Sequence, residues 1–423
     1  MPLVGGLTAR QIWRYDQVMS EFPRIISVDD HVIEPPNVWT DRLPSKYAGV
    51  GPRVVRAPMK EVTFIGGKFT PVIGEPGTGP DVDWWLYEDL KRPLVRLDAA
   101  AGHPRDEIRV EGTTFEWMRT GSYRVKERLE DMDVADIESS LCFPTFPRFC
   151  GQTFLEAADK DLALLCVKAY NDWMVEEWCT GSDGRLIPLT IVPLWDAGLA
   201  ADEVRRNAAR GVRAVCFSEI PPFLGLPSVH DPDNYWDPFF GACAETGTVI
   251  NMHIGSSSKM PSTSADAPAA VGSTLTFANA CYSLVDWLLC GAFNRFPTLT
   301  IAYSEGQIGW IPYILERIDV VWEENRAWGG VADKVLVPPS QLFHEHVYGC
   351  FFSDAHGLRS LDVIGADRVT YESDYPHSDS TWPHTRKIAE EQTRGLDPAT
   401  IELIMRGNAI RMLGLDAQGR WRP

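Results

Sequence analysis

The sequence predicts an α/β protein of the (β/α)₈ TIM-barrel class, and two observations lead to this prediction. From about Arg124 onward, short runs rich in β-branched residues alternate with longer helical patterns, which is typical of βα units and a parallel sheet. Together with a run near the N-terminus, the chain holds eight strand candidates. Eight parallel strands with right-handed crossovers close most simply into a barrel, and a doubly wound open sheet is the alternative fold.

Most strand candidates are followed by a helical segment. We expect strands at residues 24–30, 136–143, 185–194, 212–217, 248–254, 299–304, 347–353 and 368–373. We expect helices at residues 156–178, 199–210, 236–245, 276–293, 308–323, 358–364 and 383–393. This order predicts one domain over residues 1–423, with the barrel at about residues 24–415.

A long segment interrupts the alternation after the first strand. Residues 45–121 are rich in glycine and proline, and the stretches FIGGKF and GEPGTGP are typical of hairpin turns and linkers. Because this insertion follows a strand, it is predicted to leave the barrel at the C-terminal face, where TIM-barrel active sites lie. We therefore expect Trp84 and Trp85 to help form the wall of the pocket.

Composition and charge exclude several classes of function. The 423 residues are 44% hydrophobic, and their formal net charge of −18 opposes the phosphate attraction that underlies most nucleic-acid binding. The nine cysteines include no CxxC pair and predict buried thiols in a reducing, cytoplasmic compartment. The N-terminal residues show no apolar signal segment, and Asp286 interrupts the apolar run 276–293, so we expect no membrane span.

Four metal-capable side chains lie at the C-terminal ends of three predicted strands. Asp29 and His31 are two residues apart in the first strand, so both point to the lumen, while Asp30 points toward the helices. His253 ends the fifth strand, and Asp374 follows the eighth. In a closed barrel the eighth strand neighbours the first and the fifth lies across the lumen, so these side chains can converge. The sequence therefore predicts a metal site formed by Asp29, His31, His253 and Asp374.

The donor set restricts the metal. Two carboxylates and two imidazoles suit Zn²⁺ best, although such mixed sets also accept Mn²⁺, iron or cobalt. The fourth strand carries no lysine that could be carbamylated to bridge two ions, so we expect one divalent ion. Taken singly, each residue has a structural explanation, because strand-end aspartates cap helices and single histidines are often satisfied in the core. The prediction depends on their co-location.

With their flanking residues, these positions resemble the amidohydrolase-related family, in particular the branch that includes aminocarboxymuconate-semialdehyde decarboxylase and the resorcylate-type decarboxylases. The matching segments are SVDDHVIEPPNVW, NYWDPFFGACAETGTVINMHIGS, FNRFPTLTIAYSEGQIGWIPYILERID, RVTYESDYPHSDSTWP and RGNAIRMLGL. The resemblance implies a mononuclear metal site in a TIM barrel. It places the Asp-x-His pattern on Asp29 and His31, the fifth-strand histidine on His253 and the eighth-strand aspartate on Asp374.

The chain departs from that pattern at the end of the sixth strand. The resemblance implies a proton-moving histidine there in decarboxylases, whereas this chain reads Ser304, Glu305 and Gly306. Glu305 could bind water or substrate, or it could cap the helix expected from residue 308. His377, three residues after Asp374, could orient substrate or a neighbouring carboxylate, or make a structural hydrogen bond.

Further side chains near the predicted mouth are candidates for substrate binding. Arg148, after the second strand, could pair with a substrate carboxylate through its planar guanidinium, although solvation at the surface is its more usual fate. Trp382 and Ser304 lie close to predicted mouth loops, and His356 follows the top of the seventh strand. We therefore keep Arg148, Trp382 and Ser304 as substrate-binding candidates.

Three hypotheses of function follow. The first is a metal-dependent hydrolase of a small organic substrate, in which the ion activates water and Asp374 takes its proton, with Glu305 and His377 as further catalytic candidates. It is favoured because decarboxylation needs a proton at carbon, and the Ser304 hydroxyl is a far poorer acid than imidazole. The alternative is a non-oxidative metal-dependent decarboxylase of a small carboxylic acid, aromatic acids included. The third is a catalytically silent barrel that binds a small ligand.

We also expect a two-fold homodimer.

Overall fold

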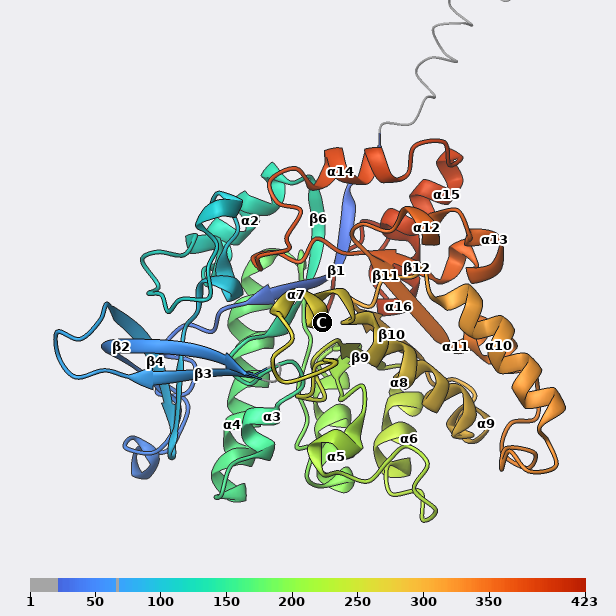
Figure 1. The fold of residues 1–423 in the computed structure, drawn as a ribbon, viewed down its shortest axis with the longest axis horizontal. Helices are drawn as coiled ribbons and strands as arrows, with labels where there is room; N and C mark the ends of the chain where they lie inside the picture. The colour runs from blue at the N-terminus through green and yellow to red at the C-terminus, as the bar shows by residue number, and fades with distance from the viewer. Residues whose placement is uncertain (1–21, 66–67) are drawn as a thin grey trace, which may run out of the picture.

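The computed structural model describes residues 22–65 and 68–423 and confirms the predicted barrel (Figure 1). Its strands are β1 (Ile25–Val32), β6 (Ile137–Pro144), β7 (Leu186–Ile187), β8 (Ala214–Cys216), β9 (Val249–His253), β10 (Ile301–Ser304), β11 (Val347–Phe351) and β12 (Val369–Tyr371). They pair in the order β7-β6-β1-β12-β11-β10-β9-β8. A parallel bridge between Thr190 and Val215 joins the two ends of this sheet and so closes the barrel.

The third barrel strand is much shorter than predicted. Only Leu186–Ile187 form β7, whereas we expected a strand over residues 185–194. Pro188 and Pro193 lie within that run and lack the backbone N–H that a ladder needs. The chain therefore leaves the ladder early and pairs with β8 at Thr190.

Helices form the layer around the strands. The longer ones are α2 (Val125–Val134), α4 (Lys160–Trp173), α5 (Ala197–Ala208), α6 (Asp237–Thr246), α8 (Phe277–Leu289), α10 (Ile311–Glu324), α11 (Pro339–His346) and α14 (Thr385–Gln392). The shorter ones are α3 (Gln152–Leu155), α7 (Ala269–Thr274), α9 (Ala292–Arg295), α12 (Ala355–Leu358), α13 (Leu361–Ile364), α15 (Pro398–Glu402) and α16 (Asn408–Leu413). Asp159 and Asp196 cap α4 and α5 by accepting hydrogen bonds from first-turn amides. The helix expected at residues 358–364 is two short helices instead, α12 and α13.

The insertion forms a sheet of its own. Strands β2 (Arg53–Ile65), β3 (Lys68–Ile73), β4 (Asp81–Tyr87) and β5 (Leu90–Pro93) are antiparallel in the order β3-β2-β4-β5. Figure 1 shows this sheet in blue at one side of the barrel. The GEPGTGP stretch connects β3 to β4, as expected of a turn. The glycine pair of FIGGKF, residues 66–67, lies outside the described residues, as do residues 1–21 with the signal-segment prediction.

The two neighbouring tryptophans of the insertion do not form the wall of a pocket. Successive residues of a strand face opposite sides, so Trp84 and Trp85 enter different cores. Trp85 packs against Trp39 and Phe146 in the main hydrophobic core, and Trp84 belongs to a small cluster with Met59. Both side chains are almost fully buried. The expectation was wrong because their packing partners come from distant parts of the chain.

Two expectations from composition can be compared with the structure. All nine cysteines are free thiols, and all except Cys281 are buried, as their scattered spacing predicts. Within residues 22–65 and 68–423, no helix combines the length and the apolar character that crossing a bilayer requires.

Candidate metal centre

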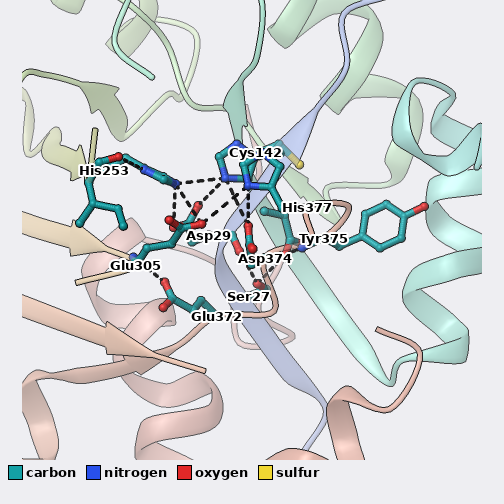
Figure 2. Close-up of polar contacts among 12 residues, drawn as sticks. Ser27, Asp29, Cys142, His253, Glu305, Glu372, Asp374, Tyr375 and His377 are labelled. Carbon is teal, nitrogen blue, oxygen red and sulfur yellow. Dashed lines mark hydrogen bonds and ion pairs between the residues drawn. The ribbon is translucent and has the colours of Figure 1, made fainter. Parts of the chain in front are cut away.

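Six ionisable side chains meet at the C-terminal mouth of the barrel (Figure 2). They come from β1, from the end of β9, from the residue after β10 and from the loop after β12. These residues are Asp29, His31, His253, Glu305, Asp374 and His377. The structure thus brings the four predicted ligands together with two further residues that the sequence singled out.

The imidazoles of His31 and His253 are at the middle of this cluster. The His31 Nε2 atom lies 3.5 Å from Asp29 Oδ1 and 3.5 Å from Asp374 Oδ1. The His253 Nε2 atom lies 3.5 Å from Asp29 Oδ2 and 3.1 Å from His31 Nε2. Two imidazole nitrogens and the two carboxylates therefore face one small volume.

The chemistry of these carboxylates fits a cation. Both oxygens of Asp29 and both oxygens of Asp374 are buried, and among the described residues no donor meets them in good hydrogen-bond geometry; His377 Nδ1 lies 3.0 Å from Asp374 Oδ1. Burial raises the pKa of both carboxyl groups well above the usual range, and the nearby Glu372 and Glu305 raise that of Asp29 further. Burial also lowers the pKa of His31, which keeps its imidazole neutral. Buried carboxylates without partners are costly, and a divalent cation bound to oxygen and nitrogen ligands would supply the missing partner.

Asp30 links the strands that carry the acidic residues. Its Oδ1 atom accepts hydrogen bonds from Ser27 Oγ at 2.9 Å, Ser373 Oγ at 2.6 Å and the Tyr375 amide at 3.1 Å, and its Oδ2 atom accepts one from Ser140. Asp30 therefore points away from the lumen, as the strand alternation predicts. Because Ser373 and Tyr375 flank Asp374, their hydrogen bonds to the buried Asp30 carboxylate fix the Asp374 loop against β1.

Glu305 lies beside the predicted ligands and does not cap a helix. Its Oε1 atom lies 3.6 Å from His253 Nε2 and 3.7 Å from His377 Nδ1. The amides of Ile308 and Gly309 donate instead to Asp354, so the capping interpretation of Glu305 was wrong. Burial alone would raise the pKa of Glu305, but the interactions with His253 and His377 outweigh it and lower that pKa well below the usual range.

His377 lies over the predicted ligands. Its Nδ1 atom is 3.0 Å from Asp374 Oδ1, and its ring stacks on His31 with 3.5 Å between the ring centroids. Burial alone would lower the pKa of His377, but Asp374 and Glu305 hold it well above the usual range. The side chain keeps 16% of its surface exposed, so it borders both the buried carboxylates and the mouth.

The comparisons with known proteins agree with this architecture. Residues 81–415 match the family model described as amidohydrolase. The chain belongs to the amidohydrolase family. This amidohydrolase is 22% identical over 325 residues to the 2-amino-3-carboxymuconate-6-semialdehyde decarboxylase of Dictyostelium discoideum, covering 73% of the chain and 82% of the relative.

Solved structures show the same fold. An amidohydrolase from Mycobacterium avium subsp. paratuberculosis K-10 superposes with a TM-score of 0.67 at 20% identity, covering 94% of this chain and 100% of that one. The 5-carboxyvanillate decarboxylase of Novosphingobium aromaticivorans, solved with manganese and 4-hydroxy-3-methoxy-5-nitrobenzoic acid, superposes with a TM-score of 0.54 at 19% identity. That match covers 68% of this chain and 79% of the decarboxylase.

Sequence reasoning missed a buried glutamate of this amidohydrolase. Glu372 lies beside Glu305 and accepts a hydrogen bond from the Glu305 amide at 3.0 Å (Figure 2). It also accepts one from Cys350 Sγ at 2.5 Å. Its Oε1 atom is buried and has no partner among the described residues, and burial raises its pKa to about 8. The signal available in the sequence was its spacing of two residues before Asp374.

A cavity of about 520 Å³ opens beside Glu305. His356, at the top of the seventh barrel strand, lines it, as expected of a pocket residue. The three substrate-binding candidates do not line it. Arg148 pairs with Glu156 and donates to Ser258, and Trp382 donates to a backbone carbonyl and packs on the ring of Tyr375. Ser304 is buried at the end of β10, in register with His253.

Proposed function

We propose that this amidohydrolase is a metal-dependent, non-oxidative decarboxylase of a small carboxylic acid. The observation that carries the proposal is the position of His377, which brings a proton donor to the mouth between Asp374 and Glu305 although the sixth strand ends in Ser304. The names of the Dictyostelium relative and the Novosphingobium structure support decarboxylation over the hydrolysis that we first favoured.

The proposal assigns one divalent ion to Asp29, His31, His253 and Asp374. Glu305 is a further ligand candidate, because its Oε1 atom can share one volume with donor atoms of the first three. Carboxylate and imidazole donors accept both Zn²⁺ and Mn²⁺, and manganese is the ion in the Novosphingobium structure. When bound, the ion supplies positive charge that neutralises a substrate carboxylate and its neighbouring oxygen.

The residues of the chain handle the proton. In the reaction, the bond between the carboxylate and its carbon breaks, carbon dioxide leaves and the electron pair stays on that carbon. His377 then donates a proton to this carbon, which completes the replacement of carboxylate by hydrogen. Asp374, 3.0 Å from His377 Nδ1, orients the imidazole and stabilises its charged form.

The test is a comparison of two substrate panels on protein loaded with Zn²⁺ or Mn²⁺. We expect carbon dioxide from a hydroxybenzoate or muconate-type acid, with activity lost on chelation and restored by the metal. Hydrolysis of esters, lactones or amides without release of carbon dioxide would contradict the proposal.

Two variants test the proton donor. His377→Asn should reduce carbon dioxide release strongly, whereas His384→Asn, a change at an exposed histidine of the same loop, should leave it unchanged. Full activity in His377→Asn would contradict the assignment of His377 as the donor.

A further inference from the structure

The cavity beside Glu305 defines the far end of the substrate. We propose that this amidohydrolase acts on monocarboxylic acids whose remaining part is an uncharged ring with neutral hydrogen-bonding groups, and that it discriminates against a second carboxylate. This inference rests on the proposed function, because it takes the carboxylate that leaves to be the one at the metal centre.

The walls of the cavity suit a flat, neutral group. Phe277, Trp310 and Phe352 contribute aromatic surface. Thr276 and Gln307 add a hydroxyl and an amide, both of which can donate and accept hydrogen bonds without carrying charge. An aromatic ring with hydroxyl or similar substituents fits this combination.

The charges at the cavity are negative. Its lining includes the carboxylates of Glu305, Asp354 and Asp379 and, among the described residues, no lysine or arginine. The Asp354 carboxylate accepts hydrogen bonds from the amides of Ile308 and Gly309. Asp379 is largely exposed at the rim, and its carboxylate lies 3.7 Å from the Arg105 guanidinium. Glu305 faces both the cavity and the metal centre. A second carboxylate in this cavity would therefore meet like charges without a cationic partner.

The opposite side of the mouth has a guanidinium, but carboxylates surround it. Hydrogen bonds from the Ser378 amide to Leu97 and from the Ala101 amide to Pro376 hold the insertion against the loop that carries His377. Arg92 of β5 lies near Asp98, Glu34 and Glu156, and also near Arg148, which pairs with Glu156 at 2.9 Å. These three carboxylates offset the positive charge of the two guanidiniums, so this side attracts a second carboxylate less than two free arginines would.

The test compares two acids that differ by one carboxylate. Isothermal titration of the Zn²⁺-loaded or Mn²⁺-loaded protein with 2-hydroxybenzoate and with 4-hydroxyisophthalate measures the binding of each acid, and carbon dioxide release in the same samples shows whether turnover contributes to the heat. We expect the diacid to bind at least about tenfold more weakly than the monoacid, the scale of an unfavourable like-charge contact.

Two charge variants locate the effect. Thr276→Arg places a cation in the cavity and should remove most of the difference between the two acids. Gln418→Arg adds the same charge at an exposed position of the C-terminal segment and should not change it. This segment lies at the other end of the barrel, because Trp421 donates to the carbonyls of Gly184, before β7, and Gly211, before β8. An unchanged ratio in Thr276→Arg would show that the far end of the substrate does not occupy this cavity.

The outcomes separate this inference from the proposed function. Equal or tighter binding of the diacid to the wild-type protein would overturn the inference alone, and loss of that binding in Arg92→Gln would place the second carboxylate at Arg92. Failure of both acids to bind the metal-loaded protein, together with no release of carbon dioxide from any acid of the panel, would overturn the proposed function together with the inference.

Discussion

Removal of the Asp30 carboxylate should destabilise the fold and loosen the metal centre. Asp30→Ala takes away four hydrogen bonds and leaves the donors on Ser27, Ser140, Ser373 and the Tyr375 amide without their buried acceptor. At about 1 kcal/mol for each hydrogen bond lost, the unfolding free energy should fall by about 4 kcal/mol. The Asp374 loop loses its attachment to β1 at the same time, so metal affinity should fall as well.

The matched substitution is Asp30→Asn. Its carbonyl oxygen keeps the three donors on Oδ1, and its amide can donate to the Ser140 hydroxyl, so we expect a loss of only about 1 kcal/mol. Urea denaturation and metal content after dialysis measure both effects, with Asp202→Ala at an exposed helix position as the control. If Asp30→Ala were as stable as Asp30→Asn and held its metal equally well, Asp30 would not have this positioning role.

Three further predictions test other parts of the account. Burial raises the pKa of Glu219, which accepts hydrogen bonds from the Gly255 amide and Ser257 Oγ, to about 7. Between about pH 4.5 and 7 the folded protein therefore keeps a proton that the unfolded chain releases, and the unfolding free energy should fall by up to about 3 kcal/mol as the pH rises. Urea denaturation of Glu219→Gln should show a smaller fall, and an equal fall would exclude Glu219 as the cause. Chelation should lower the melting temperature in a calorimeter and added metal should restore it, because a ligand bound to the folded state stabilises it; an unchanged value would argue against a bound ion. Light scattering at micromolar concentration should give twice the mass of one chain, and a monomeric mass would contradict the expected dimer.

Much of the barrel could be predicted from local sequence patterns. The β-rich runs place seven of the eight barrel strands within a few residues, because a buried parallel strand requires continuous apolar and β-branched residues. The exception is β7, where Pro188 and Pro193 end a run that looks continuous by hydrophobicity. The insertion was recognisable by its glycine and proline content. Its antiparallel sheet was not, because it depends on direct pairing between β2 and β4, which β3 separates in the sequence.

The candidate site was predictable where one strand carries two residues and not where distant loops meet. Asp29 and His31 could be placed because residues two apart share a face of a strand. Glu305 could not be separated from a helix cap, because its contact with His377 depends on a left-handed backbone conformation with φ of 55°. Trp382 follows Asp374 closely in the sequence, but its indole N–H donates a hydrogen bond to the backbone carbonyl of Asp131 and so does not face a substrate.

The most direct test of the central claim is elemental analysis of the purified protein. We expect close to one transition-metal ion for each wild-type chain, and a similar content in Asp202→Ala. Asp29→Ala and His253→Ala should each lose most of the metal, because a site of four ligands that loses one donor competes poorly with water. Unchanged metal content in both variants would contradict the metal centre.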